Sequence, residues 1–276
     1  MKVNAWTAGL SAVLLTGTLA GCSSREEPEA VACEALSIPE TENSGEPSPE
    51  IKVVEEGFSE VRKKEYDPSY SIVSAGAVLE NTSDRVAYRT RVVFDSLNKS
   101  GASNLAEPDG IFKTVEVPVM NPGEQVRVGT VLAPSLGART FEVSVLASVT
   151  QWLDRADTTN GLAPVKVSIA DPGAAQSSVS SQVEIPLAVE NTNCRSSVFR
   201  GYSALYRDSS GTLIGGFTET GGTPDGNACT AGMSTARMLA GEDYMPEEID
   251  LTKIEVSAMC DLAPNENPGE RNRPLN

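Results

Sequence analysis

Beyond its first fifty residues, the chain contains short runs in which apolar and polar residues alternate. Residues typical of turns separate these runs. The alternation is clearest at 86–95, 139–149 and 182–190, where every second residue lies on one mostly apolar face. A period of two residues is the pattern of a β-strand that buries one face in a core. Asn98–Gly101 and Asp208–Gly211 have the composition of hairpin turns between such strands. No amphipathic helical period is evident after the N-terminal segment, so the pattern predicts an all-β protein.

The body of the chain contains an internal repeat. Three short motifs recur in the same order, each about 110 residues further on. They are Leu79–Thr82 with Val189–Thr192, Ile51–Val53 with Val165–Val167, and Phe141–Ser144 with Ile254–Ser257. Each copy places several short strands in about 100 residues, which is typical of an antiparallel sandwich of immunoglobulin-like type. We therefore expect two tandem antiparallel immunoglobulin-like β-sandwich domains, at 51–154 and 163–263, with a linker at 155–162 and a polar tail at 264–276.

The N-terminal residues 1–21 have the features of a secretion signal that is cleaved. Lys2 supplies the positive charge, and an apolar stretch centred on Leu10–Leu15 follows it. The stretch ends in the sequence Leu-Ala-Gly-Cys at Leu19–Cys22, which resembles the lipobox of bacterial lipoproteins. This resemblance implies that Cys22 is diacylated, becomes the new N-terminus and anchors the protein to the extracytoplasmic face of the cell membrane.

An uncleaved signal anchor is the alternative, because no residue from Val3 to Ser24 is charged and the stretch is long enough to span a membrane. Its many Gly, Ala, Ser and Thr residues make it weakly apolar, which favours cleavage and lipidation. Residues 22–50, which include the acylated cysteine, are rich in Pro, Ser and Glu and show no apolar period. This composition predicts an extended acidic tether, in which Cys33 is the one feature that a plain tether does not need.

The charge and residue content exclude several classes of function. The chain has 38 acidic and 22 basic residues, and its net charge of −16 repels phosphate backbones, so we expect no nucleic-acid partner. It contains no histidine, which excludes histidine-based triads, histidine metal sites and the usual general base near neutral pH. Gly-x-Ser-x-Gly, Walker and dinucleotide-binding motifs are absent as well. We therefore expect a protein that is not an enzyme and that carries no cofactor.

Two motifs that suggest chemistry have simpler explanations. Ser96 and Lys99 match the Ser-x-x-Lys pattern of penicillin-binding enzymes, but they fall in a predicted hairpin turn and the partner motifs are missing. Asp154, Asp157 and Asn160 offer oxygen ligands between the two domains, where Ca²⁺ can stiffen a joint. Their spacing does not fit an EF-hand loop, so we prefer a solvated acidic linker, and calcium binding stays open.

Acidic turns and a glycine-rich stretch are the other candidate sites. Asp208, Asp225 and Asp243 lie in separate turns or loops, and nothing in the sequence brings two of them to one cleft, as catalysis by paired carboxylates requires. The stretch Gly215–Gly226 is the most glycine-rich part of the chain and lies beside Cys229. A long loop of this kind is where a sandwich often carries recognition, although flexibility alone also explains its composition.

Four cysteines remain once Cys22 is assigned to lipid: Cys33, Cys194, Cys229 and Cys260. An even number of cysteines in an oxidising compartment predicts two disulfides, with three possible pairings. A metal site is disfavoured, because the sequence has no Cys-x-x-Cys pair and no histidine. Cys260 continues the inward-facing alternation of the last predicted strand, so its sulfur should point into the second sandwich.

The turn motifs of the body resemble those of the FxLyD-type sandwich modules of bacterial surface lipoproteins. The matching residues in the first copy are Asn81–Ser83, Ser100–Gly101 and Asn121–Glu124, the last with the sequence Asn-Pro-Gly-Glu. The second copy keeps Asn191–Thr192 and Ser210–Gly211 but lacks the Pro-Gly-Glu element. The resemblance covers both domains and implies extracytoplasmic modules that bind or present, with no catalytic residues.

In the family that the chain resembles, a cysteine in the turn after an early strand lies close to the end of the final strand. The resemblance thereby implies a disulfide between Cys194 and Cys260, with Cys229 then bonded to Cys33. The second possibility is a pair of disulfides that joins Cys194 to Cys229 and Cys33 to Cys260.

Taken together, these features predict a membrane-anchored extracytoplasmic lipoprotein that binds or presents without catalysis. Its partners are the membrane, through the lipid on Cys22, and an unidentified protein or other component of the cell envelope. An enzyme, an enzyme accessory subunit or a small-ligand carrier of the envelope is the alternative. A deep pocket lined by several acids would favour the enzyme, and a flat polar face with a glycine-rich rim would favour binding.

Overall fold

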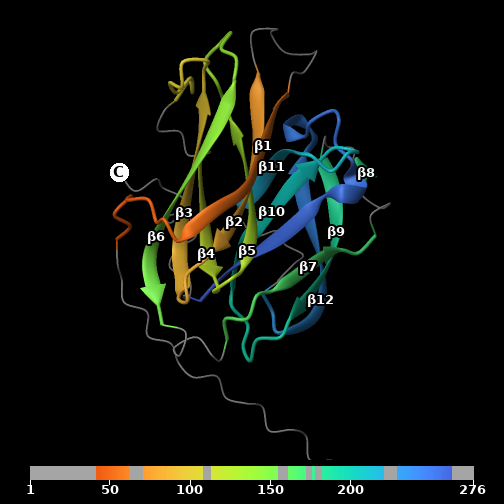
Figure 1. Ribbon diagram of the computed structural model, residues 1–276. Coiled ribbons are helices and arrows are strands. Elements are labelled where there is room, and N and C mark those ends of the chain that lie inside the picture. The colour runs from red at the N-terminus through yellow and green to blue at the C-terminus, as the bar shows by residue number, and fades with distance from the viewer. Residues whose placement is uncertain are drawn as a thin grey trace, which may run out of the picture. The chain divides into compact units, whose positions relative to one another are not determined.

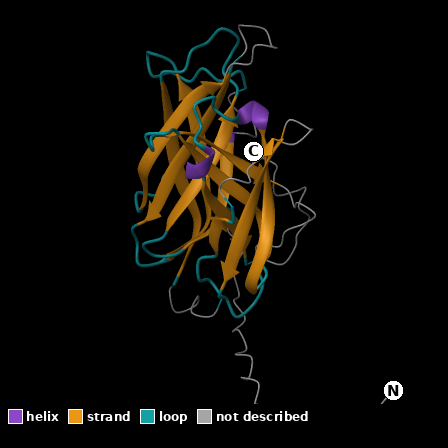
Figure 2. Cartoon of the chain, turned by 90° about the vertical axis from the view of Figure 1, so that its right-hand side faces the viewer, coloured by secondary structure: helices purple, strands orange, loops and turns teal. Residues whose placement is uncertain are grey.

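The computed structural model describes residues 42–61, 71–107, 113–154, 161–171, 176–177, 182–220 and 229–262. These residues form β-strands and connecting turns, together with two short 3₁₀ helices, η3 (Glu242–Tyr244) and η4 (Leu251–Lys253) (Figure 2). The predicted all-β class is therefore confirmed.

The first sandwich consists of two three-stranded antiparallel sheets, with strand orders β1-β2-β5 and β4-β3-β6 (Figure 1). The bounds are β1 Ile51–Val61, β2 Ile72–Asn81, β3 Val86–Leu97, β4 Thr114–Met120, β5 Gln125–Leu132 and β6 Glu142–Leu153. Alternate residues of these strands meet between the sheets, where Val73, Phe94 and Val128 are among the fully buried side chains of one apolar core. The period of two residues in the sequence therefore describes this core correctly.

The second sandwich repeats the topology of the first. Its sheets have the orders β7-β9-β12 and β11-β10-β13, and a short strand β8 also pairs with β9. The bounds are β7 Lys166–Ile169, β8 Gln176–Ser177, β9 Gln182–Asn191, β10 Val198–Arg207, β11 Leu213–Thr220, β12 Gly232–Gly241 and β13 Glu255–Asp261. If β7 corresponds to β1 and β9 to β2, then β10 to β13 correspond in order to β3 to β6. Sheet β7-β9-β12 then matches β1-β2-β5, and sheet β11-β10-β13 matches β4-β3-β6. The repeat seen in the sequence thus has a counterpart in the strand order.

The repeated Asn-Thr landmark makes the same contacts in both sandwiches. Asn81 closes β2, and its Nδ2 donates to the carbonyl oxygen of Met120 at 2.9 Å. Asn191 closes β9, and its Nδ2 donates to the carbonyl oxygen of Cys229 at 2.8 Å. Each Oδ1 also accepts the N–H of the second residue that follows it. Both asparagines are buried, and each satisfies the carbonyl oxygen of a residue about 40 positions further on as well as forming its own turn.

Sheets β1-β2-β5 and β11-β10-β13 pack on one another, and we call them the inner sheets; β4-β3-β6 and β7-β9-β12 are the outer sheets. The contact between the inner sheets is made largely by glycines and other small residues. A Cβ atom placed on Gly129 would lie 2.2 Å from the backbone nitrogen of Phe217, and one on Gly76 would lie 2.6 Å from the carbonyl oxygen of Gly215. The two backbones therefore approach more closely than side chains would permit.

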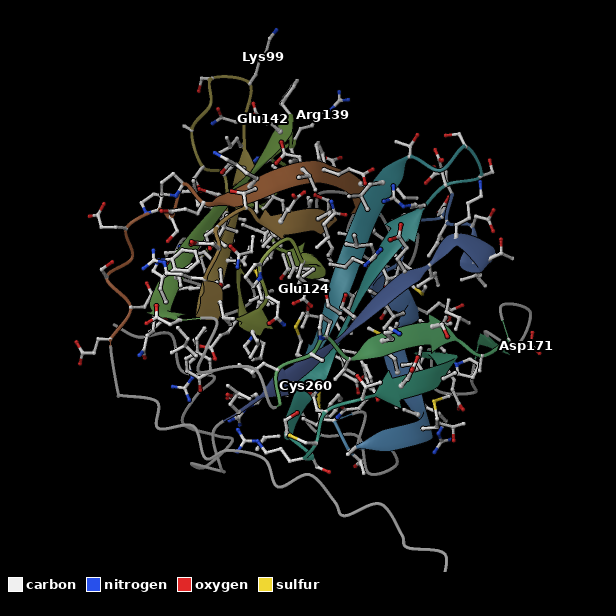
Figure 3. The ribbon with its side chains drawn as sticks, turned by 60° about the horizontal axis from the view of Figure 1, so that its bottom comes forward. Lys99, Glu124, Arg139, Glu142, Asp171 and Cys260 are labelled. Carbon is white, nitrogen blue, oxygen red and sulfur yellow. A yellow bond between two sulfur atoms is a disulfide. The ribbon has the colours of Figure 1, made fainter. Side chains whose placement is uncertain are left out.

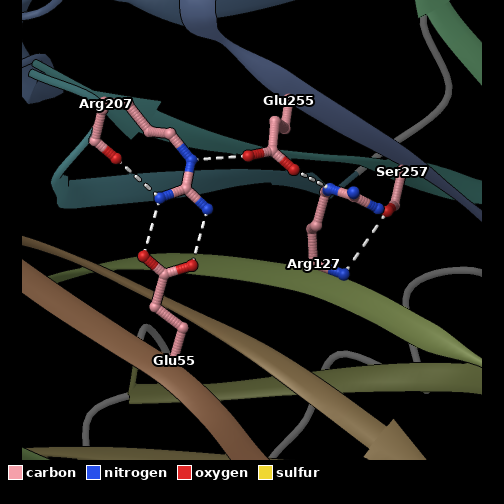
Figure 4. A network of polar contacts seen from close by, with 6 residues as sticks. Glu55, Arg127, Arg207, Glu255 and Ser257 are labelled. Atoms are coloured by element: carbon pink, nitrogen blue, oxygen red, sulfur yellow. Dashed lines mark hydrogen bonds and ion pairs between the residues drawn. The ribbon is translucent and has the colours of Figure 1, made fainter. Parts of the chain in front are cut away.

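A polar network crosses the same contact (Figure 4). Arg207 on β10 donates through Nη1 and Nη2 to both carboxylate oxygens of Glu55 on β1, at 2.7 and 2.6 Å, and through Nε to Glu255 on β13 at 2.5 Å. Arg127 on β5 also bonds to Glu255, and its backbone N–H reaches the hydroxyl of Ser257 at 3.4 Å. The hydrogen bonds from Arg207 lower the pKa of Glu55. Each guanidinium thus links the two sandwiches through a carboxylate.

The end of the predicted tether is bonded to the first sandwich. The backbone N–H of Ser48 donates to the carbonyl oxygen of Ala147 at 2.8 Å, and its hydroxyl accepts the N–H of Val149 at 2.9 Å. Asn43 adds a hydrogen bond from Nδ2 to the carbonyl oxygen of Ser148 at 3.1 Å. Because β6 is an edge strand, this segment covers backbone groups that would otherwise be open to another chain.

The disulfide between Cys194 and Cys260 that the family resemblance implied is wrong, because Cys260 is bonded to Cys229. The pairing of Cys229 with Cys33, and the second possibility, are excluded for the same reason. Asn191 holds the carbonyl of Cys229, which brings this residue under β13, whereas Cys194 is exposed in the turn after β9. Cys194 is also disulfide-bonded, to a partner outside the described residues. Cys33 lies outside them as well.

Candidate binding site

A cavity of about 300 Å³ lies where edge strands of all four sheets meet, namely β4, β5, β13 and β7. We call it the junction cavity. Its apolar walls come from both sandwiches and from the segment between them: Val117, Val119, Leu162, Val165, Met259 and Leu262. Its size is at the small end of the range for ligand cavities in proteins.

The segment that joins the sandwiches is fastened to both of them beside the cavity. Asn121, in the turn before β5, donates through Nδ2 to the carbonyl oxygen of Leu162 at 2.5 Å. Asn193, in the turn after β9, donates through Nδ2 to the carbonyl oxygen of Ala163 at 2.9 Å and accepts its N–H at 2.7 Å. One asparagine from each sandwich therefore fixes the segment, so that this wall of the cavity is formed before any ligand enters.

Glu124 is the only acid that the described residues contribute to the lining of this cavity, and it is partly buried (Figure 3). Its Oε2 accepts the backbone N–H of Asn121 at 2.7 Å and the Nδ2 of the same residue at 3.1 Å. Burial raises the pKa of Glu124 against the effect of these two hydrogen bonds. Two cations also line the cavity, but Arg127 is paired with Glu255 and Lys166 with Glu190.

A second polar cluster lies next to the cavity, around Asp261 at the end of β13. Asp261 is fully buried and accepts hydrogen bonds from the hydroxyl of Tyr88 at 2.9 Å and from Nε and Nη2 of Arg200 at 3.0 and 2.8 Å. Burial, and then the charge of Asp261, raise the pKa of Tyr88. Nη2 of Arg89 on β3 lies 3.8 Å from Oδ2 of Asp261, and the backbone of Arg89 has a φ of 52°. The cluster joins both sandwiches, and its carboxylate is neutralised by arginine.

The structure does not bring together the residues of the Ser-x-x-Lys pattern. The hydroxyl of Ser96 shares a buried hydrogen bond of 2.7 Å with that of Thr140, whereas Lys99 extends into solvent from the hairpin turn (Figure 3). Asp154 ends the described part of the linker, and Asp157 and Asn160 lie outside the described residues. The calcium hypothesis for this linker therefore stays untested.

The acids in turns have local roles where the structure describes them. Asp208 accepts the N–H groups of Ser210 and Thr212 at 2.9 Å each, and the hydrogen bonds with Ser210 lower its pKa. Asp243 lies in η3, and Asp225 lies outside the described residues. Within the part of the chain that the structure describes, no three acids, cysteines or histidines lie close enough to hold a metal ion.

The glycine-rich stretch divides into two parts with different environments. Gly215 and Gly216 do not belong to a loop, because they lie in β11 and pack against Ser74 and Gly129 of the other inner sheet. Residues 221–228 lie outside the described residues. The sequence pattern predicted a long loop, either flexible or used for recognition, and for its first two glycines the loop assignment is wrong because close packing of two sheets also selects glycine.

Sequence reasoning assigned Glu124 only to a turn motif and missed its position in the cavity. Its contact with Asn121 is local and readable from the Asn-Pro-Gly-Glu pattern, but the walls around it come from segments far away in the chain. Cys22 lies outside the described residues, as does all of 1–41.

Comparison with protein-family models and with curated proteins gives no match for this chain. Among the residues that the structure describes, no helix has the length and apolar character needed to cross a membrane.

Proposed function

We propose that the protein is a membrane-anchored extracytoplasmic lipoprotein that binds a partner without catalysis, and that the junction cavity is its binding site. The observation that carries this proposal is a preformed cavity between two fastened sandwiches, with aliphatic and polar walls and one carboxylate. Preorganisation of this kind lowers the free-energy cost of binding. The lipobox-like motif at Leu19–Cys22 supports the anchor, and the turn motifs shared with FxLyD-type modules support the extracytoplasmic location.

An enzyme is less well supported, because catalysis by paired carboxylates needs two acids at one site and the described lining of the cavity contains one. A small-ligand carrier is the second candidate function, since the volume of the cavity suits a small molecule or one side chain of a partner.

The anchor is tested by a Cys22→Ala variant of the full chain, followed by separation of membrane and soluble fractions. Stable anchoring needs two acyl chains, and this variant receives none, so it should be released or left unprocessed. Retention of a correctly trimmed Cys22→Ala protein in the membrane fraction would contradict the anchor.

The location of the binding site is tested by photo-crosslinking in intact membranes. A photoreactive residue at position 166, whose side chain is 72% exposed at the cavity, should capture a partner. The same group at position 184, on the outer sheet β7-β9-β12, is the matched control. Equal capture at both positions would remove the cavity as the binding site.

A further inference from the structure

The acids at the junction of the sandwiches differ in how their charge is balanced. Asp261 is paired with Arg200, and Glu255 is paired with both Arg127 and Arg207. The carboxylate of Glu124 accepts its two hydrogen bonds from Asn121, and no described cation lies within salt-bridge distance of it. A carboxylate removed from water without a positive partner is costly, and the raised pKa of Glu124 reflects this cost.

The surroundings of Glu124 define the group that would balance it. Glu124 lines a cavity whose walls combine polar groups with aliphatic side chains, among them those of Val117, Val119 and Leu262. A ligand that fits both features has an apolar stem and a positive end, as in a chain of methylene groups that ends in an ammonium. The ammonium would replace the lost hydration of the carboxylate, and the stem would replace water against the valines.

The acidic character of the protein favours the same kind of ligand. A net charge of −16 attracts cations over distances of about a Debye length and raises their local concentration at the surface. The cations that line the cavity do not oppose this attraction strongly, because Arg127 and Lys166 each have an acidic partner of their own.

We propose that the junction cavity binds an alkylammonium group, with Glu124 as its counter-ion and the aliphatic walls around its stem. This inference rests on the proposed binding role and assigns a chemistry to its site. The alkylammonium comes either from a lysine side chain of a protein or from a free diamine, and the two sources share the same contacts.

The experiment measures binding to the full chain by isothermal titration calorimetry with two probes. One is 1,5-diaminopentane, and the other is a blocked pentapeptide with a central lysine between valines. The same peptide with norleucine in place of lysine is the control for the stem without the charge. We expect the wild-type chain to bind at least one lysine-like probe and not to bind the norleucine peptide.

Two variants locate the site. Glu124→Gln keeps an acceptor for Asn121 and removes the charge, so it should weaken binding at least tenfold. Glu184→Gln removes one acid of the exposed pair with Arg237, neither of which lines the cavity, and should leave the affinity unchanged. Thermal unfolding curves of both variants show whether either has lost its fold.

A measurement on the wild-type chain keeps the test valid if Glu124→Gln does not fold. The carboxyl carbon of Glu124, followed by NMR in ¹³C-labelled protein, should titrate at lower pH when the probe is present, because an ammonium favours the charged carboxylate. Binding of the diamine alone, or of the peptide alone, supports the proposal and identifies the source. Failure of both probes to bind, equal affinity in a folded Glu124→Gln variant, or an unchanged titration overturns it.

The outcomes also separate this inference from the proposed function. If a membrane partner is captured at position 166 but amines do not bind, the alkylammonium assignment fails and the binding role stands. If amines bind through Glu124 and Cys22→Ala protein stays in the membrane, the anchor fails and the site stands.

Discussion

Strands β2 and β9 occupy the same position in the two sandwiches, yet their outward faces have opposite environments. At the centre of the inner sheet, Gly76 of β2 lies opposite Gly129 of β5, and both are buried against the second sandwich. The equivalent pair of the outer sheet is Pro186 of β9 and Arg237 of β12, and the Arg237 side chain is 47% exposed. The same fold thus carries two surfaces, one for packing against a sheet and one for contact with water.

The burial of the two strands shows this difference along their length. Residues 73–79 of β2 are all buried, on both faces, whereas β9 alternates between buried and partly exposed residues. Strand β10 of the other inner sheet is likewise buried without alternation from 201 to 206. Two copies of one sandwich can therefore pack together when the outward face of one sheet in each copy carries small, buried residues. The alternating core and the buried asparagine of each copy need not change for this.

The largest expected effect comes from filling the inner contact. A Gly129→Val variant has no room for its side chain beside Phe217, so we expect it to lose ~3 kcal/mol or more of stability. The matched change in the outer sheet, Arg237→Val, should cost less than about 1 kcal/mol. Urea unfolding followed by circular dichroism measures both. Similar losses would mean that the inner sheets are not in contact in solution.

The second test exchanges core residues between the sandwiches. Met120 of the first core corresponds to Cys229 in the repeat, because Asn81 and Asn191 bond to the carbonyl oxygens of these two residues, and both residues are buried. A Cys229→Met, Cys260→Ala variant should lose ~3 kcal/mol, because the bond closes a loop with a sequence separation of 31. Hydrogen exchange should show the loss in β9–β13 and little change in β1–β6. A uniform loss would mean that the two sandwiches unfold together.

The third test removes the cation that bridges the inner sheets. Arg207→Met leaves Glu55 and Glu255 without their shared guanidinium, and we expect a loss of ~2 kcal/mol, less than for a fully buried pair. Arg237→Met on the outer sheet removes an exposed pair and should cost less than ~0.5 kcal/mol. Chemical denaturation at low and high salt measures the loss of stability in each of the two variants. Equal costs would show that the network does not hold the sandwiches together.

The smallest effect concerns pH and Glu219 on β11. Burial raises the pKa of Glu219 from 4.5 to about 7, against a hydrogen bond of 3.2 Å from the N–H of Leu239. The folded state therefore holds the proton more tightly than the unfolded state, so this group favours folding at low pH and the benefit is lost as pH rises from about 5 to 8. A Glu219→Gln variant should be more stable than wild type at pH 8 by ~1 kcal/mol, after allowance for partial exposure. Thermal unfolding at pH 5 and pH 8 checks this, and an unchanged pH difference in the variant would contradict it.

Much of the fold could be predicted because its signals are local. The alternation in 182–190 describes β9, and the repeated Asn-Thr motif indicated two copies of one sandwich. The same period predicted that Cys260 belongs to the last strand, and it lies in β13, where it is partly buried. Its partner could not be predicted, because three pairings satisfy the sequence and only the folded chain brings Cys229 next to Cys260.

The candidate site was much harder to predict. Glu124 stood out only as the last residue of a turn, and its local bonds to Asn121 agree with that interpretation. The aliphatic walls that leave this acid partly buried come from β4, from the linker and from β13, which are separated by up to about 150 residues. The small residues Ser74 and Gly76 could have indicated that β2 is covered on its second face, since an outward face in water carries more polar side chains.

By itself the sequence determined the class of fold, the duplication and the inward face of strands that alternate, such as β9, since a period of two residues and turn-forming residues act over a few positions. Only the tertiary structure decided which sheets are inner, which cysteine bonds to Cys260 and why no cation of the described residues pairs with Glu124. These properties depend on distances between segments far apart in the chain. Alternation of apolar residues specifies that one face of a strand is buried. Which segment covers that face, and which charged groups such as Glu124 are enclosed with it, depend on the packing of two whole sandwiches.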